Sequence, residues 1–328
     1  MKSRIQLTET PGTFQPLLRA ILPVMFLLSL AVACGPAQTG PGESQPQEPR
    51  RGQYTIKPFP VIGNIYSVGL SNNTSFLITT PEGHILIDPT LEKAVPDIRK
   101  NIEQLGFNLS DIKIIIPTHA HADHVGGLAE FKELTGAKVM VMDRDAATVA
   151  SGDPREDGTT RWKPVAIDHE LTDGEQVRLG GVTLTAHLTA GHTRGCNSMS
   201  TVAEENGRNY NVVIICSIRL GTGVPLIGNQ NYPTIAEDIA SGLKKLKSLP
   251  ADVWLVSHSY MFGMDEKLQR MEQGESNPFI DPEGYQAYVA EIETTFLEQL
   301  EKERAGGPPY DGRIPPRAIC PEDGRTCY

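Results

Sequence analysis

Residues 112–124 read IKIIIPTHAHADH, and this stretch decides the fold. The first five residues are apolar apart from Lys113, which is the length and composition of a buried strand. The strand runs directly into a loop that carries three histidines and one aspartate within residues 119–124. A loop at the end of a rigid strand can hold ligands in fixed positions. We therefore predict a metal-binding loop at the end of a buried strand.

Short apolar or alternating runs extend in both directions from this strand. They predict strands at 65–68, 75–79, 84–87, 138–142, 176–179, 182–187 and 253–256, with a hairpin turned at 205–207. Helical periodicity predicts helices at 91–105, 125–134, 233–246 and 282–303. Helices before and after each group of strands favour an α/β (α+β) class, an αββα sandwich of two mixed β-sheets flanked by helices, over a doubly wound parallel sheet.

The composition restricts the partners. The 328 residues, of which 39% are hydrophobic, suffice for one large domain or two ordinary ones, and no short-period repeat is evident. Asp and Glu total 40 against 30 Lys and Arg, which gives a formal net charge of -10. Such a surface repels polyphosphate, so we expect no nucleic-acid partner.

The beginning of the chain is typical of an exported protein. Basic residues precede a mostly apolar run at 20–33 that is too short for a comfortable membrane span, and we interpret residues 1–33 as a signal peptide. Residues 30–35 read LAVACG, as at a bacterial lipoprotein cleavage site, with Cys34 as the lipidated first residue. Ordinary signal-peptidase cleavage and a retained helix are the alternatives. We expect a periplasmic protein that is anchored to the outer membrane if Cys34 carries lipid.

The remaining boundaries follow from composition. Residues 36–51 are mainly Pro, Gly, Gln and Glu and cannot bury enough apolar surface to fold. We therefore expect a flexible tether at 34–52, a catalytic domain at 53–305 and a C-terminal tail at 306–328.

Four further cysteines could pair in an exported protein. Cys320 and Cys327 flank a turn-rich loop and are predicted to form a small bridge. Cys196 and Cys216 fall roughly opposite each other about the turn at 205–207, which leaves a disulfide and two buried free thiols as open alternatives.

Two histidines elsewhere could complete a pair of metal sites. His192 lies in a glycine-bearing loop after a strand, and His258 also stands just past a strand, whereas His84, His169 and His187 are expected to be ordinary histidines. Nitrogen and carboxylate ligands without thiolate suit zinc in an open, catalytic site. We predict two Zn²⁺ per chain, with one ion on His119, His121 and His192 and the other on Asp123, His124 and His258.

Such a pair of ions predicts hydrolysis. A hydroxide bridging them has a pKa near neutrality and can attack a carbonyl, while the ions stabilise the developing negative charge. No serine or cysteine nucleophile is needed. The predicted catalytic residues are His119, His121, His192 and Asp123.

The loop pattern His-x-His-x-Asp-His, with Gly191-His192-Thr193 and His258, resembles the metallo-β-lactamase superfamily, whose fold is the αββα sandwich. The resemblance is narrower to the third subclass of metallo-β-lactamases, at residues 191–196 (GHTRGC), 232–238 (YPTIAED) and 277–282 (NPFIDP). It implies the two zinc sites assigned above. It also implies an enzyme that hydrolyses the amide bond of a small-molecule β-lactam antibiotic. We expect the catalytic domain to be monomeric or weakly associated.

One feature of the chain bears on the alternatives. Glyoxalase II, lactonases and other superfamily hydrolases carry an aspartate that bridges both metals, on the strand matching residues 212–217. That strand has no carboxylate here, and Ser217 matches the serine of the third subclass. The alternatives are another dinuclear zinc hydrolase that acts on a thioester or lactone, and a non-catalytic metal-binding lipoprotein. The presence of all six ligands argues against the latter.

The resemblance also suggests roles around the metals. Ser217 and Arg219 are expected to bind substrate, because some relatives offer a second serine where Arg219 stands; the alternative is a solvated arginine. Asp88 could support a ligand histidine, or be a turn residue before proline. The disulfide that relatives often form at positions matching Ala251 and Tyr285 is absent.

Overall fold

The structure is a computed structural model that describes residues 55–154 and 160–312. The predicted signal peptide 1–33, the lipid-bearing Cys34, the tether 34–52 and the bridge between Cys320 and Cys327 lie outside the described residues. Within the described ranges, no helix is both long and apolar enough to cross a bilayer.

The first sheet has seven strands that follow one another in chain order. They are β1 (Phe59–Ile62), β2 (Ile65–Ser67), β3 (Phe76–Thr80), β4 (Gly83–Ile87), β5 (Ile112–Ile116), β6 (Lys138–Met142) and β7 (His169–Leu171). The first four pair antiparallel and the last four pair parallel, so the sheet is mixed. Strand β5 lies between two parallel neighbours and is buried except at Lys113, as its apolar composition predicts.

The second sheet has five strands in the order β12-β11-β10-β9-β8. They are β8 (Gln176–Leu179), β9 (Val182–Leu188), β10 (Asn197–Glu205), β11 (Arg208–Ile215) and β12 (Val253–Val256). Only β11 and β12 pair parallel. Alternate residues of the two sheets share one buried core, including Ile78, Ile85, Ile114, Leu184, Met199 and Val212. The two sheets therefore pack face to face.

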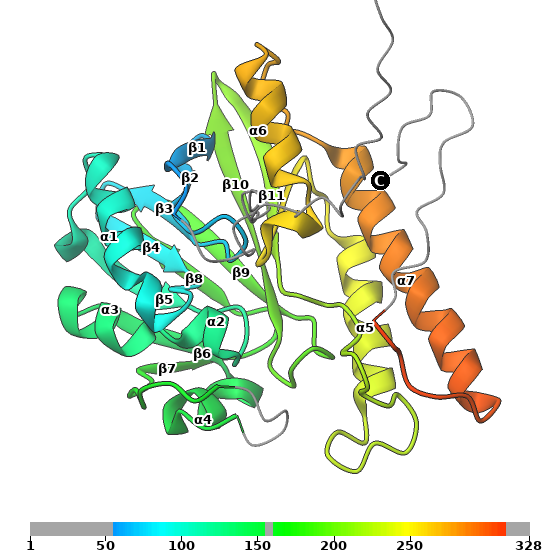
Figure 1. Ribbon diagram of the computed structural model, residues 1–328. Coiled ribbons are helices and arrows are strands. Elements are labelled where there is room, and N and C mark those ends of the chain that lie inside the picture. Colours follow the sequence, from blue (N-terminus) through cyan, green and yellow to red (C-terminus); the bar gives the residue numbers. More distant parts are fainter. Residues whose placement is uncertain (1–54, 155–159, 313–328) are drawn as a thin grey trace, which may run out of the picture. The chain divides into compact units, whose positions relative to one another are not determined.

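Helices cover the outer faces of both sheets, which confirms the αββα sandwich (Figure 1). Those following strands of the first sheet are α1 (Val95–Gln104), α2 (Ala122–Val125), α3 (Leu128–Thr135) and α4 (Asp143–Ser151). Those following strands of the second are α5 (Ile235–Ser248), α6 (Met264–Glu272) and α7 (Pro282–Arg304). A second core joins α1 and α3 to the outer face of the first sheet through Leu86, Ile98, Ile115 and Phe131.

The structure differs from the sequence prediction at several elements. The helix predicted at 125–134 is interrupted at Gly126 and Gly127, where a Cβ atom would lie 2.5 Å from the carbonyl oxygen of Ala122 and 2.6 Å from that of Pro89. A side chain at either position would therefore clash with α2 itself or with the loop after β4. Strands β1 and β7 and helices α4 and α6 had not been predicted.

A disulfide joins Cys196 to Cys216, with Cα atoms 5.9 Å apart. The sequence had left a disulfide and two buried free thiols as alternatives at these positions, and the structure has the disulfide. Both cysteines are fully buried, and the bond ties the loop before β10 to the residue after β11. Each cysteine is close in sequence to a predicted site residue, His192 or Ser217.

The segment at 277–282 secures α7. Asp281 caps this helix by accepting a hydrogen bond from the Gly284 amide at 3.1 Å, and it pairs with Lys267 of α6 at 2.8 Å. Lys267 is only 5% exposed and lies 5.0 Å from the Trp254 ring, so burial lowers the pKa of its ammonium group. Nearby, the Tyr285 hydroxyl donates to the Leu246 carbonyl oxygen at 2.7 Å and links α7 to α5.

We predict that Asp281→Ala lowers the free energy of unfolding by about 3 kcal/mol, because it leaves the buried Lys267 charge without its partner. Urea unfolding of the zinc-loaded protein measures this effect. The control is Asp265→Ala, which removes an exposed carboxylate from the same helix as Lys267 and should change stability by less than about 1 kcal/mol. Equal effects of the two variants would contradict this account.

Candidate metal centre

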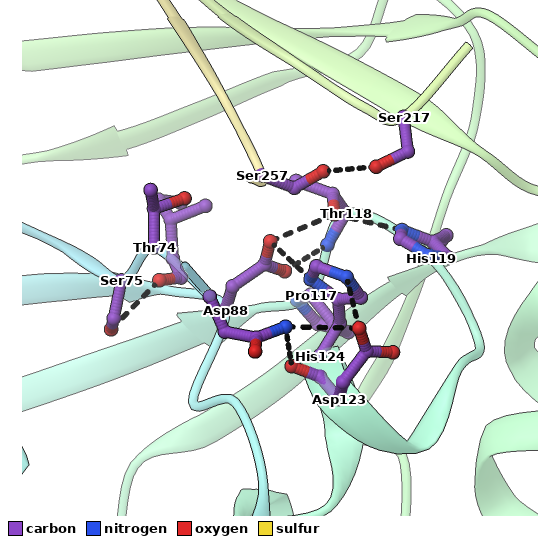
Figure 2. A network of polar contacts seen from close by, with 12 residues as sticks. Thr74, Ser75, Asp88, Pro117, Thr118, His119, Asp123, His124, Ser217 and Ser257 are labelled. Carbon is purple, nitrogen blue, oxygen red and sulfur yellow. Dashed lines mark hydrogen bonds and ion pairs between the residues drawn. The ribbon is translucent and has the colours of Figure 1, made fainter. Parts of the chain in front are cut away.

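The buried carboxylate of Asp88, at the end of the neighbouring strand β4, holds the histidine loop. Asp88 accepts hydrogen bonds from the Thr118 amide at 2.6 Å and from the Thr118 hydroxyl at 2.8 Å. The Asn197 side chain holds the same residue from the second sheet, since its amide nitrogen donates to the Thr118 carbonyl oxygen at 2.8 Å. Figure 2 shows the network around Asp88. The loop is therefore fixed from both sheets before any ligand atom is considered.

The first group of candidate ligands brings together His119, His121 and His192, whose ligand atoms all lie within 4.8 Å of one another. Nδ1 of His119 is 3.1 Å from the Thr118 hydroxyl oxygen, while its buried Nε2 has no hydrogen-bond partner among the described residues. Burial lowers the pKa of His119 and His192 well below 6.5, and neighbouring imidazoles lower it further. The rings of His119 and His192 are therefore neutral at pH 7 and can offer lone pairs to a metal.

The second group consists of Asp123, His124 and His258. Oδ2 of Asp123 lies 3.4 Å from Nε2 of His124 and 3.6 Å from Nε2 of His258, and the two nitrogens are 3.4 Å apart. On its other side, Nδ1 of His124 is 3.0 Å from the Asp88 carboxylate. The Asn73 side chain donates to Oδ2 of Asp123 at 2.9 Å. Asp88 thus contacts a candidate ligand histidine, and its supporting role stays a prediction from the family resemblance.

The charges of the second group differ from those of the first. Burial alone would lower the pKa of His124, but the carboxylates of Asp123 and Asp88 raise it to about 10. Burial and the nearby His124 lower the pKa of His258 to about 3. Burial alone would raise the pKa of Asp123, but His124 holds it far below its usual range. Two imidazole nitrogens and one oxygen of an ionised carboxylate converge here, and such a set of atoms is a suitable site for a cation.

Two cavities reach the candidate ligands. The first, of about 330 Å³, contacts both groups and is lined by residues that include His192, Ser217, Arg219, His258, Tyr260 and Tyr310. The second, of about 450 Å³, lies beside the first group and includes His121, Arg144, His192 and Arg194. His192, Gly221 and Thr222 line both cavities. Substrate therefore has room on two sides of His192.

The predicted substrate-binding residues both line the first cavity. The Ser217 hydroxyl is 2.6 Å from that of Ser257 and is almost fully buried (Figure 2). The Arg219 side chain is 21% exposed, and its nearest ion-pair oxygen belongs to Glu291 at 3.8 Å. Arg219 is therefore a partly buried cavity residue with a distant counter-charge, and its binding of substrate stays a prediction.

Some residues around the centre had not been predicted from the sequence. Asn73 contacts Asp123, and Asp145 belongs to the helix α4 that had not been predicted. Tyr310 lies in the region assigned to the tail, where its carbonyl oxygen accepts from the Gly223 amide at 2.7 Å. His84, His169 and His187 belong to neither candidate group, in line with their expected ordinary roles.

Comparison with solved structures gives close relatives. The metallo-β-lactamase FEZ-1 from Legionella gormanii is 41% identical to this chain and superposes with a TM-score of 0.75, over 77% of this chain and 98% of FEZ-1. BJP-1, a subclass B3 metallo-β-lactamase of Bradyrhizobium japonicum, is 34% identical with a TM-score of 0.73, over 78% of this chain and 98% of BJP-1. These values show that the chain has the fold of the two metallo-β-lactamases and is homologous to them.

Sequence comparison gives a broader family. The model of the metallo-beta-lactamase superfamily matches residues 68–204. A hydroxyacylglutathione hydrolase of Rhodopseudomonas palustris (strain BisB5) is 29% identical over 192 residues, which are 58% of this chain and 64% of that protein. The chain thus spans less than two thirds of this curated relative. Its near-complete coverage of FEZ-1 at 41% identity shows that the chain belongs to the metallo-β-lactamase superfamily of hydrolases.

Proposed function

We propose that this chain is a zinc-dependent β-lactamase that hydrolyses the amide bond of β-lactam antibiotics. The observation that carries the proposal is the composition of the two ligand groups: within residues 55–154 and 160–312 they contain one carboxylate, Asp123. Ser217 stands where an aspartate would bridge both metals in thioester and lactone hydrolases, and it lines the cavity that touches His192 and His258. The similarity to FEZ-1 and BJP-1 supports the same function.

The fit of zinc to the site supports this chemistry. Two bound Zn²⁺ ions would activate a water at neutral pH and polarise the substrate carbonyl. The neutral imidazoles of the first group offer lone pairs, and the buried Nε2 of His119 lacks any other partner among the described residues. The carboxylate of Asp123 supplies negative charge to the second group. We assign one ion to His119, His121 and His192 and the other to Asp123, His124 and His258.

The cavity supplies a way to orient the substrate. A β-lactam presents a carboxylate beside its ring, and the Arg219 guanidinium can hold such a group through two parallel hydrogen bonds. The Ser217 hydroxyl lies on the wall of the same cavity. With the carboxylate held there, the amide carbonyl would be positioned near the ligand groups, which restricts the orientation of attack.

A second candidate function is hydrolysis of a thioester. It is favoured by the similarity to hydroxyacylglutathione hydrolases, although the chain spans only 64% of the length of the relative from strain BisB5. The lack of a second carboxylate between the ligand groups of the described residues is the observation against it. Export, lipidation of Cys34 and a monomeric state remain predictions.

We predict that the zinc-loaded protein hydrolyses a penicillin, a cephalosporin or a carbapenem, and that a chelator abolishes the activity. His192→Ala should remove most of the activity because it deletes a proposed ligand. His169→Ala, which alters a histidine outside both groups, should behave like the wild type. A larger kcat/KM for a hydroxyacylglutathione thioester than for every β-lactam would establish the second candidate instead.

We predict that Arg219→Ala raises KM for a β-lactam by about tenfold and lowers kcat less, because a hydrogen bond to a charged group is worth about 1.5–3 kcal/mol. Glu291→Gln should have the opposite effect on KM, since it removes the counter-charge 3.8 Å from Arg219. Steady-state kinetics measures both effects, with Arg178→Ala on β8 as the control. An unchanged KM in Arg219→Ala would exclude this role.

We predict that the stability of the metal-free protein is greatest near pH 6.5. Below this pH the unfolded histidines take up protons that buried His119, His192 and His258 resist, so stability falls. Above it the stabilising charge of His124 is progressively lost up to about pH 10, at about 1.4 kcal/mol per pH unit.

Urea unfolding at pH 5.5, 6.5 and 8.5 tests this dependence. Saturating zinc should remove the alkaline loss, because a metal ligand must be neutral and His124 would no longer carry its proton. Chelated protein that becomes more stable between pH 6.5 and 8.5 would be inconsistent with the electrostatics of this site.

A further inference from the structure

A buried carboxylate lies behind the first ligand group and has no role in the function proposed above. Asp145 stands in the first turn of α4 and is 3% exposed. Its Oδ2 accepts hydrogen bonds from the Ala120 amide at 2.9 Å and from the Thr193 hydroxyl at 2.6 Å. Its Oδ1 accepts from the Gly195 amide at 2.7 Å. Three donors on one buried carboxylate fix its position and theirs.

These donors belong to the two loops that carry the first ligand group. Ala120 stands between His119 and His121, on the loop that follows β5 of the first sheet. Thr193 is the neighbour of His192, on the loop between β9 and β10 of the second sheet. Asp145 therefore ties together two loops from different sheets at the point where their histidines converge.

The approach of Asp145 to the second loop requires a glycine. A Cβ atom at position 195 would lie 2.6 Å from the Asp145 carboxyl carbon and 2.5 Å from its backbone nitrogen, closer than real Cβ contacts. The glycine in this loop thus lets the carboxylate reach the backbone beside His192.

The second ligand group has different supports. Asp88 contacts His124 at 3.0 Å, and Asn73 contacts Asp123 at 2.9 Å. Asp88 also reaches the first group, because it accepts from the Thr118 hydroxyl that lies 3.1 Å from Nδ1 of His119. Asp145, in contrast, bonds to the backbone and hydroxyl groups beside the first ligand group.

We propose that Asp145 is a positioning residue of the three-histidine half of the metal centre. This inference rests on the proposed binding of zinc by both groups. Loss of a carboxylate that orients metal ligands typically weakens metal binding about 10–100-fold. Loss of Asp145 should therefore affect one metal ion, whereas loss of Asp88, which contacts His124 and reaches His119 through Thr118, should affect both.

The test measures zinc affinity by chelator competition in two single-site backgrounds. His258→Ala leaves the three-histidine group intact, and His192→Ala leaves the Asp-His-His group intact. We expect Asp145→Asn to weaken zinc binding about 10–100-fold in the His258→Ala background and less than about twofold in the His192→Ala background. Asp88→Asn should weaken binding in both backgrounds, because Asp88 contacts His124 and also the Thr118 hydroxyl beside His119. Cobalt absorption spectra of the Asp145→Asn proteins should change only in the His258→Ala background.

Urea unfolding of the metal-free variants checks that each one folds. If Asp145→Asn does not fold, Thr193→Val provides the test, because it removes one 2.6 Å hydrogen bond and leaves the carboxylate in place. It should weaken the same site by a smaller factor. Equal weakening in both backgrounds, or none in either, would overturn the inference.

The outcome is separable from that of the proposed function. A selective effect of Asp145→Asn on the three-histidine site, in a protein that does not hydrolyse β-lactams, would uphold the role of Asp145 and overturn only the proposed substrate. Failure of the wild-type protein to bind zinc would overturn the inference and the zinc function together.

Discussion

The carboxylate of Asp88 is the contact on which the rest of the site depends. It holds the Thr118 amide and hydroxyl and also Nδ1 of His124, so it fixes both the start and the end of the histidine loop. Asp88 has a φ of 52°, and Thr90 one of 56°. Left-handed backbone at residues other than glycine costs about 1–3 kcal/mol and persists where surrounding contacts determine it. The strain is thus located where the metal ligands must be held.

The two sheets contribute unequally to the centre, and both are required. The first sheet presents the loop from His119 to His124, while His192 and His258 follow strands of the second. Neither ligand group is complete until the sheets have packed against each other through their shared core. Metal binding and folding are therefore thermodynamically linked. The disulfide between Cys196 and Cys216 joins the residue before β10 to the residue after β11, at the end of the second sheet that carries His192.

The sequence predicted those features that local patterns encode. The buried strand at 112–116, the dense histidine loop and the order of helices and strands sufficed for the sandwich and for the choice of ligands. The role of Asp145 was not predicted, because its hydrogen-bond partners lie 25 to 50 residues away and no local sequence pattern indicates such pairs. Strand β7 has only three residues, two of them exposed, and offers too short a signal. The contact between Arg219 and Glu291 likewise depends on how α7 packs.

We infer that two groups of three side chains form a dinuclear metal centre. Diffraction from crystals of the zinc-loaded protein, with anomalous differences measured at the zinc edge, tests this arrangement. We expect two anomalous peaks per chain, one about 2.0–2.1 Å from nitrogens of His119, His121 and His192 and the other bound by Asp123, His124 and His258. A single peak, or peaks bound by other residues, would contradict it.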